Sequence, residues 1–177
     1  MTGKRKTYVI MGMHRSGTSF LARCLQAAGV HIGDRLMGGA KGNPDGHFEN
    51  MDFVELDRKI ISAAGGTPLS GAMPPDAQSI LSTKPDFDDA ISALVKNSVK
   101  PSWGFKDPYS ALTIPLIMPH ILNEDDDPFI YVCFRKPKKV GESLQRRQDL
   151  NPVCGEHIAK EYNERILRFL RDFLELE

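Results

Sequence analysis

The residues most able to do chemistry follow the first apolar run of the chain, where Gly12 and Gly17 bracket a short loop. Their spacing is that of the phosphate-binding pattern G-x-x-x-x-G-K-[ST], and a helical periodicity follows. Thr18 stands where nucleoside-triphosphate enzymes carry a lysine, and a cation lies instead inside the loop, at Arg15. Helix-start N–H groups, hydroxyls and a guanidinium together bind anions. We therefore expect residues 12–19 to cradle an anion other than an ordinary ATP or GTP tail.

Two further apolar runs end in residues that can meet this loop. Lys106 and Asp107 close one run, and Arg135 closes the run 128–134. Ser143 lies eight residues after Arg135, so its hydroxyl and the guanidinium can hold a second phosphate. Because ligands bind at the carboxyl ends of parallel strands, we expect the three strand ends to converge on one site.

The elements that position these residues are predicted from apolar periodicity. Strands are expected over 7–13, 103–105 and 128–134, with a short further strand at 30–32. Helices are expected over 18–28, from Asn50 or Asp52 to 64, over 86–99, around 112–117 with Pro115 starting or interrupting it, from 137 through 144, and over 156–176. Strands that alternate with helices predict an α/β fold, here a three-layer P-loop-type fold with a mostly parallel central sheet flanked by helices.

Four stretches outside the predicted helices have compositions that predict their structure. The run 128–134 is continuously apolar, which is typical of a buried parallel strand. The segments 33–49 and 65–75 are rich in glycine and proline and are expected to be loops. The acidic run 124–127 is expected to form a solvated turn before the strand.

The composition of the chain narrows its class. Its 177 residues suffice for one domain with a substantial core. Equal numbers of basic and acidic residues, 23 of each, argue against general nucleic-acid binding. Three cysteines without C-x-x-C spacing argue against a disulfide framework or a zinc site. Without a secretory signal pattern or an apolar run of the ~18 residues that a membrane span needs, we expect a cytoplasmic protein with no membrane span.

Two motifs carry a resemblance to a known family. Residues 15–19, Arg-Ser-Gly-Thr-Ser, followed by Phe-Leu, resemble the 5′-phosphosulfate loop of sulfotransferases that use 3′-phosphoadenosine 5′-phosphosulfate (PAPS). Arg135 and Ser143, eight residues apart, are similar to the 3′-phosphate motif of these enzymes. Blocks at 12–18, 43–50 and 103–108 resemble bacterial sulfotransferase-like sequences. The resemblance implies one sulfotransferase-like domain, 1–177, with a donor-binding core at about 7–147 and a C-terminal amphipathic helix at about 156–176.

The resemblance also implies roles for the matched residues. The reaction would be in-line transfer of a sulfuryl group from PAPS, as co-substrate, to a hydroxyl or amine acceptor, with no metal. Arg15, and Lys106 as a second cation, would stabilise charge on the leaving phosphate oxygen. The donor-binding residues implied are Arg15, Ser16, Gly17, Thr18, Ser19, Arg135 and Ser143. The sequence departs from the family pattern at Tyr109, where a basic residue is expected.

A general base must take the proton of the acceptor. Glu49 is the first choice, because it follows a loop and lies in the block 43–50 that resembles the family. His47 competes with it, since the ordinary pKa of histidine suits neutral pH. A structural interpretation of Glu49 is an acid that interacts with the dipole of the helix after it.

Two other functions stay open, as does the acceptor. One is a P-loop nucleotide-dependent kinase or phosphotransferase, in which Asp107 would be the strand-end acid that helps to hold Mg²⁺. The other is a non-catalytic nucleotide-binding module of sulfotransferase-like type. A small molecule, a carbohydrate, a lipid or a peptide tyrosine would each supply the hydroxyl, and the loops at 33–49 and 65–85 would choose among them. A homodimer is also left open.

Overall fold

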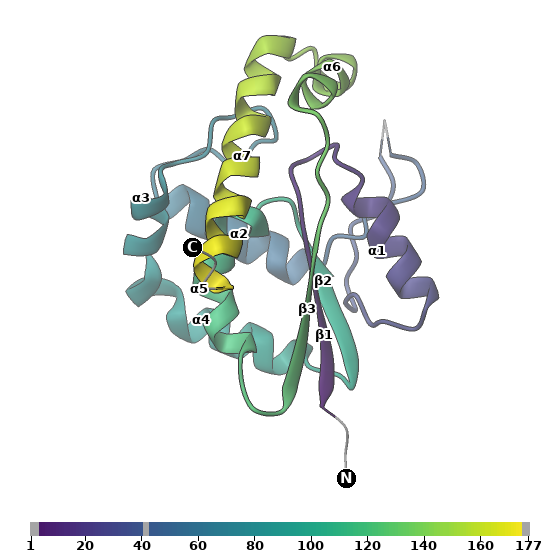
Figure 1. Cartoon of the computed structure of the whole chain (residues 1–177), viewed down its shortest axis with the longest axis vertical. Helices are drawn as coiled ribbons and strands as arrows, with labels where there is room; N and C mark the ends of the chain where they lie inside the picture. Colours follow the sequence, from purple (N-terminus) through teal and green to yellow (C-terminus); the bar gives the residue numbers. More distant parts are fainter. Residues whose placement is uncertain (1–3, 41–42, 175–177) are drawn as a thin grey trace.

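A computed structural model describes residues 4–40 and 43–174 (Figure 1). In these residues the chain forms three strands and seven helices. In chain order they are β1 (Arg5–Met11), α1 (Thr18–Ala27), α2 (Met51–Ala63), α3 (Ala77–Ser82), α4 (Lys84–Ser98), β2 (Ser102–Lys106), α5 (Ser110–Ile121), β3 (Asp126–Val132), α6 (Pro137–Gln148) and α7 (Pro152–Phe173). The predicted α/β class is confirmed.

The strands form a small parallel sheet in the order β2-β1-β3. Ile10 pairs with Lys106, and Met11 pairs with Val132, so all three strands end at nearly the same level. Figure 1 shows α1 on one side of the sheet and α5 and α7 on the other, with α6 beyond the carboxyl ends of the strands. This alignment brings the segments after the three strands to one end of the molecule.

Aromatic packing fixes α2 against the sheet. Phe53 of α2 stacks on Phe105 of β2 with ring centroids 4.0 Å apart, and Trp103 lies 6.1 Å from Phe105. All three side chains are buried, and burying aromatic rings of this size is a large part of core stability. The loop that precedes α2, which carries His47 and Glu49, is thereby placed next to the end of β2.

The start of α5 is tied to α2 by a buried carboxylate. Asp57 accepts hydrogen bonds from the hydroxyls of Ser110 and Thr113, each at 2.6 Å. Asp57 is fully buried, so these hydroxyls supply the partners that a buried carboxylate requires. They also fix the turn between β2 and α5, which contains Asp107 and directly follows Lys106.

Two glycines let α6 lie close to α7. A Cβ added at Gly141 would come within 2.2 Å of the Pro152 carbonyl oxygen, and one at Gly155 within 2.8 Å of the Gly141 Cα. The close contact holds α6 over the strand ends, which positions Ser143 and Arg147. The predicted C-terminal helix begins four residues earlier than expected, at Pro152, and its predicted end at 176 lies outside the described residues.

Several sequence expectations are corrected by the packing. The strand in 128–134 is parallel as predicted, but in the described sheet it is an edge strand, and Phe129 is 36% exposed while stacking on Tyr8. The acidic run before it is not wholly solvated, because Asp126 is buried and takes two bonds of 2.9 Å from the Arg5 guanidinium. The expected strand at 30–32 is reduced to one bridge, between His31 and Trp103.

Two helices also differ from expectation. Helix α5 runs through Pro115 and Pro119 without a break. Both prolines are exposed, whereas most of the other α5 residues are buried, so apolar burial outweighs the lost backbone bonds. Helix α3 was not predicted; its signal is Asp76, whose carboxylate accepts from the Ser79 N–H as an N-cap. None of the described helices has the length and apolar character needed to cross a membrane.

Candidate functional site

A polar cavity of about 260 Å³ lies at the carboxyl end of the sheet. It brings together most of the predicted site residues from all three strand ends and from the loop before α2. The lining residues are His14, Arg15, Gly17, Thr18, Ser19, Phe20, Asn43, His47, Glu49, Lys106, Pro108, Arg135 and Arg147. The predicted convergence of the three strand ends is confirmed.

The loop between β1 and α1 has the geometry of an anion cradle. Gly17 takes a left-handed conformation, φ 96°, at the N-cap of α1, and no side chain of the described residues caps this helix. Its first N–H groups are therefore left for a ligand at the positive end of the helix dipole. Ser16, predicted to bind the donor, has a buried hydroxyl with no hydrogen-bond partner among the described residues.

Gly12 is needed where the loop leaves β1. A Cβ at this position would come within 2.8 Å of both the Cys133 carbonyl oxygen and the Thr18 Cγ2. Both distances are shorter than real Cβ contacts, so a larger residue would push β3 or the start of α1 away. The first glycine of the pattern thus keeps the loop close to the end of β3.

Arg15 and the 135–143 region form a single cluster. The Arg15 Nε donates to the Ser143 Oγ at 3.0 Å, and the Arg135 Nη1 donates to the Arg15 carbonyl oxygen at 2.8 Å. Residues predicted for two separate phosphates are therefore in direct contact. The pKa of Arg15 is lowered, first by burial and then by the positive charges of Arg147, Arg135 and Arg146. This indicates that several cations are crowded together in this region.

Lys106 links the cradle to the predicted bases. Its Nζ lies 2.6 Å from the Glu49 Oε1 and donates to the His47 carbonyl oxygen at 3.2 Å and to the Ser19 Oγ at 3.3 Å. The His47 Nδ1 lies 3.9 Å from the same Glu49 oxygen. The carboxylate, the imidazole and the ammonium thus meet within one site. The cap of the following helix is Asn50, whose side chain accepts from the Asp52 N–H.

The two histidines of the site have lowered pKa values. Burial lowers the pKa of His14 to about 3, with the charges of Lys106 and Arg147 acting in the same direction. Burial also lowers the pKa of His47; Glu49 opposes this, and Arg147, Lys106 and Arg15 add to it. Both rings are therefore neutral at pH 7, and neither adds to the positive charge of the cavity.

Asp107 lies outside this cavity, although it is the next residue after Lys106. It is buried against Asp57, and its Oδ1 accepts from the Tyr109 N–H at 3.3 Å. Burial, followed by the charges of Asp57 and Glu49, raises the pKa of Asp107 well above its ordinary value. Its carboxyl is a buried structural group next to the site.

Asn43 and Arg147 are among the cavity residues that sequence reasoning did not assign to the site. Asn43 donates to the Ser19 Oγ at 3.4 Å and to the Gly46 carbonyl at 2.7 Å, so it links the 33–49 loop to α1. The sequence did contain a signal for Asn43, because this residue is the first of the block 43–50 that resembles the family. Arg147 comes from the last turn of α6, and only the packing of α6 over the strand ends brings it to the cavity.

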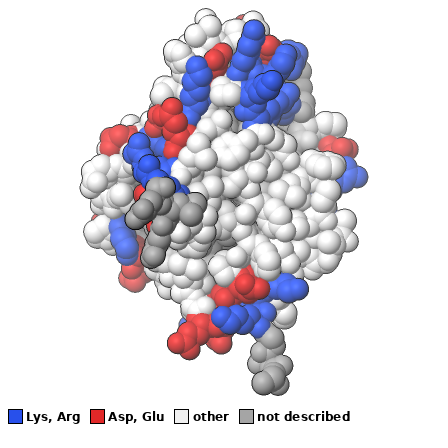
Figure 2. All heavy atoms as spheres, viewed as in Figure 1, with Lys and Arg blue, Asp and Glu red and all other residues white. Residues whose placement is uncertain are grey.

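Charge is unevenly distributed despite the neutral total. Figure 2 shows lysine and arginine side chains gathered at the end of the molecule where α6 lies. The α6 region contributes Arg135, Lys136, Lys138, Lys139, Arg146 and Arg147. This potential favours approach of an anionic ligand to the cavity.

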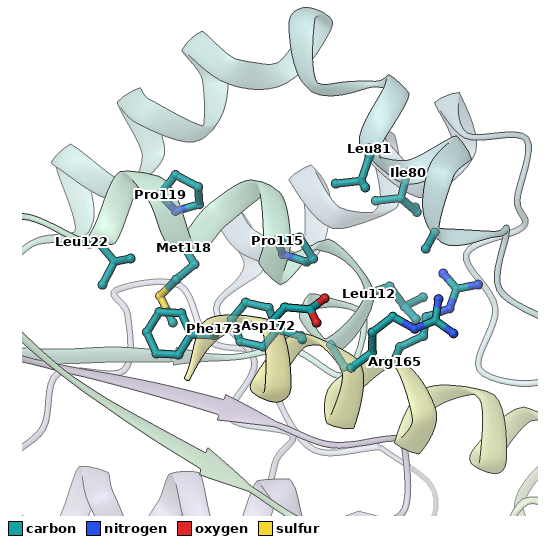
Figure 3. Close-up of a pocket in the computed structure, with 14 residues that line it drawn as sticks. Ile80, Leu81, Leu112, Pro115, Met118, Pro119, Leu122, Arg165, Asp172 and Phe173 are labelled. Carbon is teal, nitrogen blue, oxygen red and sulfur yellow. The ribbon is translucent and has the colours of Figure 1, made fainter. Parts of the chain in front are cut away.

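A different pocket, of about 310 Å³, lies between α3, α5 and α7 (Figure 3). Leu81, Pro115, Met118 and Phe173 are among its mainly apolar lining. It contains none of the residues predicted to do chemistry. The polar cavity at the strand ends is therefore the candidate functional site.

Comparison of the chain with models of protein families, with curated proteins and with solved structures finds no match.

Proposed function

We propose that the protein is a PAPS-dependent sulfotransferase with a three-layer P-loop-type fold. Support comes from the order of the two motifs along the chain and from the contact between them. The loop 12–19 lies at the N-terminus of α1, and Arg135 and Ser143 both bond to Arg15. A donor with phosphates at both its 3′ and 5′ positions needs two adjacent anion sites of this kind.

The residues present fit such a donor. The unpartnered Ser16 hydroxyl, the uncapped start of α1 and the Thr18 and Ser19 side chains would hold the 5′-phosphosulfate. Arg135 and Ser143 would hold the 3′-phosphate. Arg15, between the two, would serve both anions through charge-assisted hydrogen bonds.

Lys106 and Glu49 would act at the reacting end of the donor. PAPS supplies a sulfuryl group whose sulfur is already fully oxidised, so transfer involves no redox change. Glu49 would remove the proton as the acceptor oxygen or nitrogen bonds to sulfur, with His47 as the competing base. Lys106 and Arg15 would stabilise the phosphate oxygen, which keeps the electron pair of the broken sulfur–oxygen bond.

The observation that carries the proposal is the position of the Lys106 Nζ, in hydrogen-bond contact with both the Ser19 Oγ and the Glu49 Oε1. One cation thus spans the donor cradle and the carboxylate that would deprotonate the acceptor. An anion at the start of α1 would draw this ammonium from Glu49 and increase the basicity of the carboxylate.

The kinase alternative receives less support from the same geometry. Its metal-holding acid would have been Asp107, which is buried against Asp57 and does not line the cavity. Among the described residues that line the cavity Glu49 is the one carboxylate, and Lys106 already pairs with it.

Calorimetric titration tests the proposal. Adenosine 3′,5′-bisphosphate, the product left after transfer, is expected to bind with micromolar affinity in the absence of a metal. ATP with Mg²⁺ is expected to bind more weakly. A preference for ATP–Mg²⁺ would replace the sulfotransferase assignment with that of a kinase.

A further inference from the structure

A second pocket, of about 160 Å³, adjoins the donor cavity. The two share His14, His47, Glu49 and Arg147, which therefore separate them. An acceptor in this second pocket would reach the same base that lines the donor cavity, as transfer between the two pockets requires.

The outer walls of this pocket come from three elements. Met37 belongs to the 33–49 loop, Arg58 to α2, and Leu69 and Ser70 to the 65–75 loop. The Ser70 hydroxyl donates to the Gln148 Oε1 at 2.8 Å, which fastens the 65–75 loop to the end of α6 beside Arg147. The two loops expected to choose the acceptor thus both line this one pocket.

The charge in the pocket is unbalanced. Arg58 and Arg147 both line it, and within residues 4–40 and 43–174 neither guanidinium has a hydrogen-bond or ion-pair partner. Glu49 is the one carboxylate in the lining, and its charge is paired with Lys106 at 2.6 Å. Nothing in the described lining neutralises the two guanidinium groups.

We propose that this pocket binds an acceptor that carries an oxyanion, either a carboxylate or a phosphate, in addition to the hydroxyl or amine that receives the sulfuryl group. Arg58 and Arg147 hold the oxyanion, since a guanidinium pairs with carboxylate and phosphate through two parallel hydrogen bonds. The assignment rests on the proposed function for the identity of the transferred group.

The order of residues along the pocket sets the orientation of the acceptor. Glu49 and His47, shared with the donor cavity, mark the reacting end. Arg58 and Leu69 line only the second pocket and mark its far end. Arg58 therefore holds the oxyanion from the far end, and Arg147, which lines both cavities, holds it from the side of the donor. The body of the acceptor packs against Leu69 and the buried ring of Tyr109.

Binding of small probes to the protein saturated with adenosine 3′,5′-bisphosphate tests this assignment. The probes are 4-hydroxybenzoate, 4-hydroxyphenyl phosphate and the uncharged methyl 4-hydroxybenzoate, followed through the arginine Nε–H signals in NMR spectra. Both anions are expected to shift the Arg58 and Arg147 signals and to bind at least tenfold more tightly than the ester. The stronger of the two identifies the oxyanion.

Variants complete the test. Arg58→Gln and Arg147→Gln should each weaken binding of the anions about tenfold and leave the ester unaffected. Lys59→Gln and Arg146→Gln, which change neighbouring charges outside both linings, should have no effect. Equal affinity for acid and ester, or no loss in the two arginine variants, overturns the anionic acceptor. Failure of the bisphosphate to bind overturns the sulfotransferase assignment instead, and the same probes on the free protein then still report on the anion site.

Discussion

Lys106 and Glu49 form a buried ion pair of 2.6 Å that joins the end of β2 to the loop before α2. Their side chains are 2% and 8% exposed. A buried charge is tolerated only when it is paired, so each residue constrains the other. The pair fixes the position of the candidate base and keeps a cation at the start of α1.

Removing one member of this pair is expected to cost stability. Lys106→Met leaves the Glu49 carboxylate buried without its partner, and the free energy of unfolding should fall by about 3–5 kcal/mol. The double variant with Glu49→Gln should regain much of that loss. Urea unfolding of the wild type, both single variants and the double variant measures the coupling. Additive losses would show that the two charges do not interact; the exposed pair Lys139–Glu142 provides a control in which little change is expected.

Glu49→Gln is expected to separate catalysis from donor binding. Loss of the base should reduce sulfate transfer about 10²–10⁴-fold, measured with an acceptor that the wild type uses. Affinity for adenosine 3′,5′-bisphosphate should change less than about threefold, because Arg15, Arg135 and the helix start are untouched. Glu55→Gln in α2, the helix that follows Glu49, is the control. Full activity of the Glu49 variant would show that Glu49 is not the base and would assign this role to His47.

Arg135→Gln should act on one phosphate of the donor. Loss of a charge-assisted bond is expected to weaken binding of adenosine 3′,5′-bisphosphate about tenfold or more, which is ~1.4 kcal/mol or more. Adenosine 5′-monophosphate lacks the 3′-phosphate, so its affinity should be nearly unchanged. Calorimetry with both nucleotides, and with Lys138→Gln as the charge control, measures the difference. An equal loss for the two nucleotides would remove Arg135 from the 3′-phosphate site.

Gly12→Ala tests the tight contact at the end of β1. The added methyl group would lie within 2.8 Å of the Cys133 backbone and the Thr18 side chain. Overpacking of this kind is expected to lower the free energy of unfolding by about 1–3 kcal/mol and to weaken nucleotide binding. Gly38→Ala is the matched control, since its Cβ would meet nothing within 4 Å. Chemical denaturation compares the two, and equal stability would show that the loop has room at Gly12.

The buried pair of Asp57 and Asp107 predicts a pH dependence of stability. Burial raises the pKa of Asp57 to about 6 and that of Asp107 well above its ordinary value. Because both folded-state pKa values are raised, the contribution of this pair is complete below about pH 4, where the unfolded carboxyls are protonated too. It is lost as the pH rises through about 6 and beyond.

The Asp107→Asn variant should lose much less stability than the wild type as the pH rises. The amide neither ionises nor takes up a proton, so the variant should be more stable than the wild type at pH 8 and have a flatter profile from pH 5 to 8. Thermal melts across this range measure the difference. His14, whose lowered pKa acts in the opposite direction, is present in both proteins and cancels. Parallel profiles, or the same change in Asp89→Asn on the exposed side of α4, would contradict the assignment.

The sequence by itself predicted the elements whose patterns are local. The two glycines and the helical periodicity after them predicted the loop at 12–17 and the helix from Thr18, and both are present. The apolar runs before Lys106 and Arg135 predicted strands whose ends meet. Parallel strands share one polarity, so their carboxyl ends, and the polar residues that follow, collect at one edge of the sheet.

The pKa values of the buried groups, and which side chains lie next to one another, could be determined only from the tertiary structure. Arg58 and Arg147 belong to helices whose sequence patterns show nothing unusual. They line the same pocket because α6 packs on α7 and the 65–75 loop is bonded to α6. Asp107 looked like a strand-end acid, but burial beside Asp57 raises its pKa well above the ordinary value. Periodicity reports which face of an element is apolar, whereas pairing and protonation depend on neighbours distant in sequence and on the water that packing excludes.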